Sequence, residues 1–503
     1  MSKLLVGWAE ESIVPEKNVN LAGQFYERIS SYVESEITVT AMAIESDGEQ
    51  AILVSCDVVS LPENLLALAR KKFDAYNLDI DSKKIIVNAT HTHTSHKMAM
   101  PVDKSSTKSP AFSEVVNVLN EFLPPERQYT ALVTPDANVL TPAEAGDFVT
   151  DKIALAAKKA WENRKEALYT NEFGRAPIGM CRRVSYDDGS AQMWGDTNTA
   201  NFVALEGGND SGIELLYFFN TARKLTGVVA NIACPAQILE QRSFISADFW
   251  GRAKALIREK LGKNVYLLGL CGAGGDQCPR DLVRWVNPET PIDDPNVKRP
   301  NYLERKADPS MYDISGCNKA GKRIANEIIS VFEDITELKD SAVFKHKVID
   351  LVLPLRKVTM EQYHKAVREI EYYVDKNKDK PVFNFEDNAV LHVHSGTIAR
   401  YRRQQKEETV TIETHVLRFG DIAISTNPFE LFLDYGNRIK ARSYAKQTFI
   451  IELCCGVKGY LPTKKAEEGS HYSAYVSSGH VGHEGGDQFT RRTIDEINKM
   501  FID

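Results

Sequence analysis

The sequence contains no apolar run that could cross a membrane, which would take about 18 consecutive apolar residues. It also contains no block of Lys and Arg, and with a net charge of -7 at pH 7 it lacks the basic surface that binds phosphate backbones. Acidic residues follow the first methionine too closely for the apolar core of a secretion signal. We therefore expect a cytoplasmic protein that binds no nucleic acid and forms no stable association with a membrane.

Cysteine is also scarce, with eight residues in a chain of 503, two of them adjacent at positions 454 and 455. This pattern is not typical of a disulfide framework, so we expect reduced thiols. Internal repeats and low-complexity tracts are absent from the sequence as well. What the chain does have is 43% hydrophobic residues, enough to bury a large core.

Short apolar runs and amphipathic helical patterns alternate through most of the chain. Residues 42–56 and 184–194 alternate across Asp-Gly turns as hairpins do, and residues 147–168 and 248–261 have helical spacing. This interleaving predicts an α/β or mixed α+β fold, in which helices flank a mixed β-sheet. The proline-rich stretch 279–313 interrupts the pattern, and we interpret it as a loop or lid beside the site, with a solvated insertion as the alternative.

Five apolar runs end in residues that are capable of chemistry. These runs cover residues 85–87, 227–233, 265–270, 422–426 and 449–453, and each leads into a polar or glycine-rich segment. The carboxyl ends of strands border the ligand crevice of an open α/β sheet, so we expect one shared site at these ends. A single polar strand end would be ordinary, and it is the repetition that favours an active site.

Residues 88–96, Asn-Ala-Thr-His-Thr-His-Thr-Ser-His, place three histidines after the first of these runs. In an extended segment His91 and His93 share a face, an arrangement that suits zinc, which binds imidazole nitrogen. A polar strand end with satisfied or exposed histidines is the alternative, and we expect His96 to take no part in a site. Asp57 is a candidate to hold a ligand imidazole by a hydrogen bond.

The glycine-rich segment 271–278 is not a phosphate-binding loop. It lacks the Gly-Lys-Ser/Thr ending of such a loop, and its spacing does not match the dinucleotide fingerprint. Its glycines suit a close approach of backbone amides to a substrate, with Cys278 presented just before a proline. A tight turn that buries its thiols is the alternative.

The chain resembles the catalytic domain of the neutral/alkaline, non-lysosomal ceramidases, which are zinc-dependent amidases that release a fatty acid from an N-acyl sphingoid base. Residues 7–23 are similar to that family's opening pattern, and residues 88–94 to its Asn-x-His-Thr-His-Ser/Thr segment. Residues 427–430, Asn-Pro-Phe-Glu, and 460–463, Tyr-Leu-Pro-Thr, resemble two further motifs. Because the matches run in order along nearly the whole chain, we expect one ceramidase-like catalytic domain over residues 1–503.

The resemblance implies zinc as the cofactor, with His91, Glu430 and Tyr460 as ligands and His93 facing the substrate. Where the family has a second histidine ligand, this chain has Cys234, which the resemblance makes the fourth ligand. Cysteine is a competent zinc ligand, but a thiolate puts more charge on the metal and should make a bound water less acidic.

A second thiol stands where the family has its catalytic serine, because residues 275–279 read Gly-Asp-Gln-Cys-Pro. The resemblance therefore makes Cys278 either a nucleophile or only a weak hydrogen-bond donor. Asp276 is a candidate to orient the substrate or move a proton. Arg182 or Arg183 resembles a family arginine that lies near the substrate.

These features predict a zinc-dependent hydrolase that uses a metal-activated water to cleave an N-acyl amide bond, with His93 and an arginine stabilising the oxyanion. No lipid-docking extension is apparent, so we expect a small, polar substrate. Two alternatives stay open. One is a metal-dependent lyase or glycosidase-like enzyme that acts on a carbohydrate derivative through His93, Tyr472 or Glu484. The other is a binding protein whose site has decayed.

Overall fold

The structure, a computed structural model, describes residues 3–102, 113–130, 136–284 and 313–502. Its largest sheet has eight strands in the order β14-β13-β12-β7-β1-β3-β4-β5. Their bounds are Leu5–Ser12 for β1, Thr38–Ser46 for β3, Glu49–Cys56 for β4, Ile85–Ala89 for β5, Lys165–Arg175 for β7, Gly212–Asn220 for β12, Leu225–Ile232 for β13 and Tyr266–Cys271 for β14. The pairs β4/β5 and β13/β14 are parallel and the other pairs are antiparallel, so the sheet is mixed.

A second sheet packs against one face of the first. It has the order β16-β17-β18-β20, with bounds Phe344–Pro354, Thr409–Phe419, Ile422–Thr426 and Gln447–Ile451. Aromatic side chains fill the space between the sheets, and Trp8, Phe218 and Phe419 belong to the same buried cluster. The opposite face of the large sheet is covered by α3 (Pro142–Glu162), α4 (Asp248–Leu261) and α5 (Asp313–Glu333).

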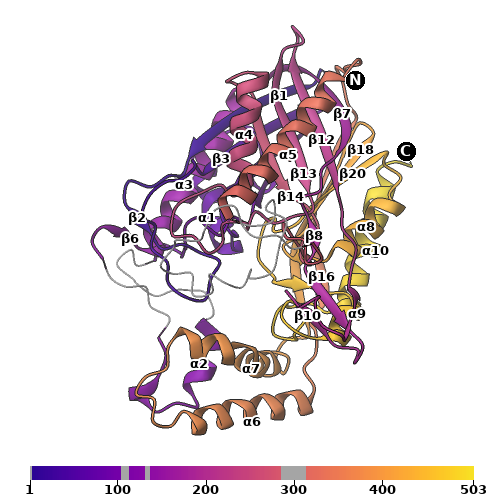
Figure 1. Ribbon diagram of the computed structural model, residues 1–503. Coiled ribbons are helices and arrows are strands. Elements are labelled where there is room, and N and C mark those ends of the chain that lie inside the picture. The colour runs from indigo at the N-terminus through magenta and orange to yellow at the C-terminus, as the bar shows by residue number, and fades with distance from the viewer. Residues whose placement is uncertain (1–2, 103–112, 131–135, 285–312, 503) are drawn as a thin grey trace.

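Helices also cover the outer face of the second sheet, which gives four layers in the order α, β, β and α (Figure 1). The covering helices are α8 (Leu433–Arg442) and α10 (His483–Lys499), which share a buried cluster with β16, β17 and β18. The predicted mixed α+β fold with flanking helices is therefore confirmed. Among the described residues, none of the helices combines the length and apolarity that crossing a bilayer requires.

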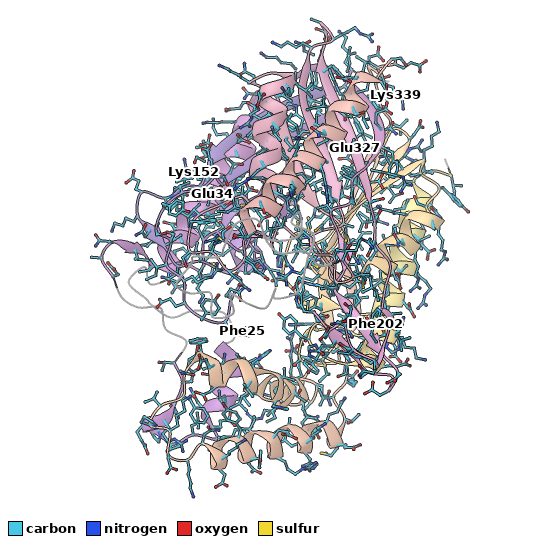
Figure 2. All side chains as sticks on the ribbon, viewed as in Figure 1. Phe25, Glu34, Lys152, Phe202, Glu327 and Lys339 are labelled. Carbon is cyan, nitrogen blue, oxygen red and sulfur yellow. The ribbon has the colours of Figure 1, made fainter. Side chains whose placement is uncertain are left out.

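Three helices form a separate helical cluster with its own core. They are α2 (Ser113–Asn120), α6 (Met360–Lys376) and α7 (Phe385–Arg403), and Leu119, Ile370 and Leu391 are buried among them. Figure 1 shows this cluster set apart from the layered body. Phe25 extends from the body toward it (Figure 2), and its ring centroid lies 4.7 Å from that of His392 in α7.

The remaining elements are the helix α1 (Glu63–Asp74), whose Leu65, Leu66, Ala69 and Phe73 belong to the same buried cluster as Trp8, and a set of short elements. The short elements are β2 (Asn18–Val19), β6 (Val139–Leu140), β8 (Met180–Cys181), β9 (Arg183–Tyr186), β10 (Ala191–Met193), β11 (Phe202–Leu205), β15 (Gln277–Cys278), β19 (Glu430–Leu431), β21 (Tyr460–Leu461), α9 (Lys464–Gly469) and 3-10 turns at Ser82–Lys84 and Pro125–Arg127.

Most local predictions agree with the structure. The hairpins predicted at 42–56 and 184–194 are present, and the helix predicted at 248–261 has these bounds. The helix predicted at 147–168 instead begins at Pro142, because Thr141 and Glu144 form a capping box at its start, and it ends at Glu162, shortly before strand β7 begins at Lys165. Most of the predicted lid, from residue 285 to 312, lies outside the described residues.

Candidate active site

The five predicted strand ends converge, and Asn88 at the end of β5 links three of them. Its Oδ1 accepts from the Cys271 N–H after β14, and its Nδ2 donates to the Glu452 carbonyl after β20. The Glu452 N–H in turn donates to the Cys271 carbonyl. After β13, the Ala236 N–H donates to the Thr90 carbonyl. Because these bonds join segments far apart in the sequence, the polar ends form one wall.

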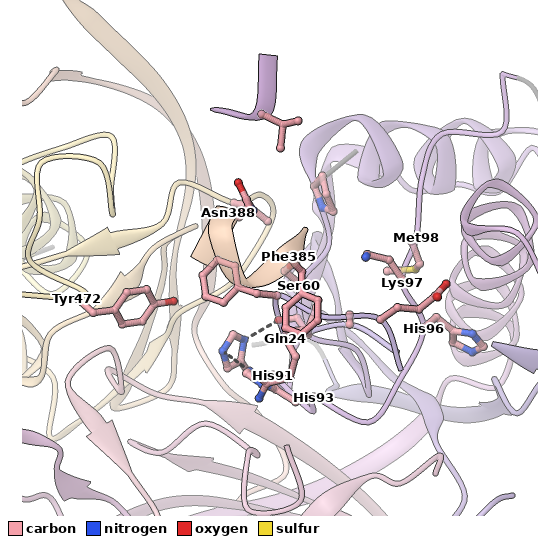
Figure 3. Close-up of a pocket in the computed structure, with 18 of the residues that line it drawn as sticks. Gln24, Ser60, His91, His93, His96, Lys97, Met98, Phe385, Asn388 and Tyr472 are labelled. Carbon is pink, nitrogen blue, oxygen red and sulfur yellow. Dashed lines mark hydrogen bonds between the residues drawn. The ribbon is translucent and has the colours of Figure 1, made fainter. Parts of the chain in front are cut away.

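A cavity of about 640 Å³ opens beside this wall. Its lining includes His91, His93 and Tyr472 (Figure 3), and with them Glu430, near His91, and Tyr460, which pairs with Glu430 and contacts Tyr472. The rest of its wall comes from the body and from the helical cluster, and it includes the apolar side chains Phe25, Met98, Val116, Phe383 and Phe385. The cavity therefore joins the end that carries His91, Glu430 and Tyr460, its polar end, to a larger chamber with many apolar side chains, in which Lys97 and His96 also take part.

His91 presents an unprotonated nitrogen to the polar end. Its Nδ1 lies 2.7 Å from the Val59 carbonyl, which can only accept, so Nδ1 carries the proton and Nε2 keeps its lone pair. Burial lowers the pKa of His91, which favours the neutral ring. The Nε2 atom lies 3.8 Å from Glu430 Oε2. Asp57 does not orient this ring, contrary to the expectation from the sequence, because its carboxylate bonds to Thr38, Thr90 and Lys254.

His93 faces His91 rather than standing beside it on an extended strand. Strand β5 ends at Ala89, and His91 has a φ of 66°, which is uncommon for a residue with a side chain. The two Nε2 atoms come within 3.2 Å of each other, and His93 Nδ1 lies 3.4 Å from Glu240 Oε2. Burial, together with the neighbouring His91, holds the pKa of His93 well below its ordinary value.

Gly23 supports His93 from the other side, and this contact gives a testable prediction. A Cβ on Gly23 would lie 2.4 Å from His93 Cγ, and its φ of +94° disfavours any side chain. We expect Gly23→Ala to displace the imidazole and to lower kcat/KM for the reaction proposed below by about 100-fold.

Gly48→Ala is the matched control for this variant, because Gly48 has a φ of +78° and a Cβ added there would meet nothing within 4 Å. Gly48→Ala should lose about 1–2 kcal/mol of unfolding free energy in urea titrations, since it places a side chain in the left-handed region. Gly23→Ala should lose at least as much, because its Cβ also overlaps the His93 ring. Equal activities of the two variants would show that the Gly23 contact does not position His93.

Glu430 and Tyr460 lie side by side because β19 and β21 pair in register at these two residues. Arg182 approaches both, with one guanidinium nitrogen 3.4 Å from the Tyr460 hydroxyl and 3.9 Å from Glu430 Oε2. Burial and the charge on Glu430 raise the pKa of Tyr460 well above its ordinary value. Burial also raises the pKa of Tyr472 to about 12, so both phenols carry their protons.

The structure distinguishes the two candidate arginines. Arg183 points away from the cavity and forms a bidentate pair with Glu206, at 2.5 and 3.0 Å. It also donates to the carbonyls of Tyr472 and Ser470. Arg182 is therefore the arginine of the site, and Arg183 holds the loop that carries Tyr472.

The two predicted thiols and Asp276 lie behind the cavity wall. The Cys234 thiol donates to the Pro235 carbonyl at 3.5 Å, and burial raises its pKa well above the ordinary value. The Cys278 thiol donates to the Arg280 carbonyl at 3.5 Å, and burial raises its pKa to about 12. Asp276 accepts from the Leu433 N–H at 2.9 Å, and burial raises its pKa to about 6.

Comparison with solved structures finds neutral ceramidases across the full length of the chain. One match is the neutral ceramidase from Pseudomonas aeruginosa, with a TM-score of 0.65 and 12% sequence identity over 99% of this chain and 74% of that one. The chain has a ceramidase-like fold. A second match, a ceramidase complexed with C2, has the same TM-score and identity and is covered over 75% of its length. No family model and no curated protein sequence matches the chain.

The ceramidase-like fold raises the question of which residues fit a metal. His91 Nε2, Glu430 and Tyr460 face one space and supply nitrogen and oxygen donors that zinc accepts. Cys234 fits less well, because its sulfur does not line the cavity and lies 3.5 Å from the Pro235 carbonyl. His93 is better placed, since 3.2 Å between two nitrogens is close to the separation of neighbouring ligands on a tetrahedral ion.

Sequence reasoning missed Glu240, which no motif marked. It lies in the turn after the β13 end, and burial raises the pKa of its carboxyl. The only sequence signal for Glu240 is that it follows the strand end at Cys234 by six residues, within the segment that leads away from a predicted part of the site.

Glu484, one of three residues named for the lyase or glycosidase alternative, is exposed at the start of α10, outside the cavity wall. Tyr472, another of the three, does line the cavity.

Proposed function

We propose that the protein is a metal-dependent hydrolase that cleaves the amide bond of an N-acyl compound. The observation that carries this proposal is His91, whose Nδ1 proton is fixed by the Val59 carbonyl while Nε2 faces Glu430 at the polar end of the cavity. A divalent metal there would supply an acidified water and a Lewis acid for the scissile carbonyl. The ceramidase-like fold supports the same reaction class.

The chain's own residues have separate tasks in this proposal. Arg182 is a buried cation that donates to the Tyr460 hydroxyl without lining the cavity itself, and its charge would act through that hydroxyl to stabilise negative charge on the substrate oxygen. Tyr472, protonated at neutral pH, would donate a hydrogen bond to the substrate. Cys278, with a pKa near 12, is a thiol and not a thiolate, which argues for attack by water over attack by sulfur.

The cavity also suggests the kind of substrate. Aromatic and aliphatic side chains such as Phe25, Met98 and Phe385 line much of it, His91, Glu430 and Tyr472 lie together at one end, and Lys97 and His96 lie beside Met98 (Figure 3). An apolar acyl group would fit this chamber better than the wholly polar substrate that the sequence suggested. We therefore propose an N-acyl compound whose acyl chain lies against the helical cluster.

Removal and return of the metal tests the reaction. The purified protein, incubated with N-acyl amides of increasing acyl length, should release free amine, with kcat/KM rising about fourfold per added methylene until the chamber is full. A chelator should abolish amine release, and stoichiometric zinc should restore it. Undiminished amine release by fully metal-free protein would overturn metal dependence. Turnover of glycosides without release of amine would favour the carbohydrate alternative.

A further inference from the structure

A second group of reactive side chains lies behind the cavity, where the loop that joins β20 to β21 meets strand β17. Within the described parts of the chain, Glu413, His415 and Cys455 are the His, Cys, Asp or Glu side chains whose ligand atoms all approach within 4.8 Å of one another. Cys454 adds its sulfur at 3.9 Å from that of Cys455. Both cysteines are buried, and neither belongs to the proposed hydrolase site.

Two charged residues lock this group together. Arg70 in α1 forms a bidentate pair with Glu413 in β17, at 2.6 and 2.9 Å, and the same guanidinium lies 3.9 Å from the Cys455 sulfur. His415 Nε2 lies 2.9 Å from Glu413 and 3.7 Å from that sulfur. Cys455 is therefore placed between an arginine and an imidazole.

Hydrogen bonding fixes the protonation of that imidazole. His346 Nδ1 faces the Gln50 carbonyl and must donate to it, so His346 Nε2 accepts from His415 Nδ1 at 2.9 Å. The other nitrogen of His415 faces the Glu413 carboxylate and carries a second proton. Burial opposes this charge, yet Cys455 and Glu413 raise the pKa of His415 above its ordinary value.

These contacts favour a thiolate at Cys455. The hydrogen bond from the Cys454 thiol, with the charges on His415 and Arg70, holds the pKa of Cys455 well below its ordinary value despite burial. The cationic Arg70 and His415 then balance the anionic Glu413 and Cys455. Since Arg70 already supplies the cation, the group needs no metal for charge balance.

We propose that Cys454 and Cys455 form a reversible thiol–disulfide site, with Cys455 as the attacking sulfur and Cys454 as the resolving one. The two sulfurs lie 3.9 Å apart and would approach to about 2.05 Å in a disulfide. The loop has an unusual backbone, because Leu453 and Cys455 are in the left-handed region, with φ of 49° and 56°. Cα atoms joined by one trans peptide are about 3.8 Å apart, closer than in most disulfides, so the bond would be strained and easily reduced.

The chemistry requires a two-electron oxidant, and a peroxide is the class we name. The Cys455 thiolate attacks one peroxide oxygen, the O–O bond breaks, hydroxide leaves, and Cys455 becomes a sulfenic acid. The Cys454 sulfur then attacks the Cys455 sulfur and forms the S–S bond. The hydroxyl of the sulfenic acid leaves with the Cys454 thiol proton as water. A dithiol returns both electrons and both protons in the reverse direction.

The loop connects this site to the cavity. Leu453 and Val457, on either side of the two cysteines, line the cavity wall. The Cys455 N–H donates to the Val87 carbonyl, and the Leu453 carbonyl accepts from the Ala89 N–H, two residues before His91. Closing the disulfide would therefore move a segment that borders the polar end.

Peroxide treatment of the full-length protein tests the proposal without reference to activity. The tryptic peptide 447–458 contains these two cysteines and no other, so a disulfide appears as the loss of two hydrogen masses that a dithiol restores. We expect Cys455 to oxidise at least about tenfold faster than Cys317, whose pKa is raised by burial. Cys454→Ser should stop the reaction at a sulfenic acid on Cys455 that dimedone traps.

Two results would overturn the proposal. The first is oxidation of Cys455 and Cys317 at equal rates in protein that retains its native circular dichroism. The second concerns zinc in the His91→Ala variant, which lacks the proposed active-site metal. If this variant binds one equivalent of zinc and the double variant His91→Ala/Cys455→Ser does not, the group is a metal site. Neither result depends on amide cleavage, so failure here is distinguishable from failure of the proposed hydrolase.

Discussion

Alanine in place of His91 is expected to lower kcat/KM for amide cleavage by about 10³-fold or more. In the proposed reaction the side chain contributes the Nε2 atom that lies 3.8 Å from Glu430, and loss of this proposed metal ligand would remove several kcal/mol of transition-state stabilisation, at about 1.4 kcal/mol for each factor of ten. Metal content measured beside steady-state kinetics should fall together with activity.

His96→Gln is the matched control for this variant. His96 belongs to the same histidine-rich segment and lies at the cavity, but its Nε2 donates to the Ile13 carbonyl at 2.7 Å. Glutamine keeps a donor, so we expect full metal content, activity within about tenfold, and a loss of about 1–3 kcal/mol in unfolding free energy. Equal loss of metal in both variants would contradict the role given to His91.

Replacing Arg183 with methionine should destabilise the protein by about 3–5 kcal/mol, because Glu206 would stay buried without its partner. Urea unfolding monitored by circular dichroism measures this change. Activity should fall as well, since Arg183 holds the carbonyls of Tyr472 and Ser470.

Two further variants sharpen the interpretation. Arg284→Met removes an arginine that is 78% exposed and paired with Asp281, and it should cost less than about 1 kcal/mol. The double variant Arg183→Met/Glu206→Met should recover part of the stability, because it removes both charges. A small effect of Arg183→Met alone would mean that Glu206 finds another partner or becomes protonated.

Local patterns in the sequence predicted much of the fold. The apolar runs before Asn88, Cys234 and Cys271 became strands because their periodicity and turns are set by near neighbours in the chain. Their convergence depends on hydrogen bonds made by Asn88 with Cys271 and Glu452, hundreds of residues away. Sequence order carries no direct signal for such bonds.

The site was predictable only where a motif marked it. His91, Glu430 and Tyr460 were named from a family resemblance, and the structure places all three at the polar end of one cavity. Arg182 and Arg183 were indistinguishable in the sequence. Adjacent side chains of an extended segment point in opposite directions, but only the pairing of the strands decides which of the two faces the site. The direction of the Cys234 thiol depends on the turn at Pro235, so its role as a ligand stays a prediction.

Two separately packed parts of the protein line the cavity. Its ionisable end is built on the layered body, whereas Phe383 and Phe385 come from the helical cluster, which has its own core around Leu119 and Ile370. Mutations that reshape the cluster need not disturb the strand ends that hold the ionisable groups. Under the proposed function, substitutions in the cluster would change which acyl group is accepted while the reaction stays the same, and exchange of the whole helical cluster would be the direct route to a new substrate range.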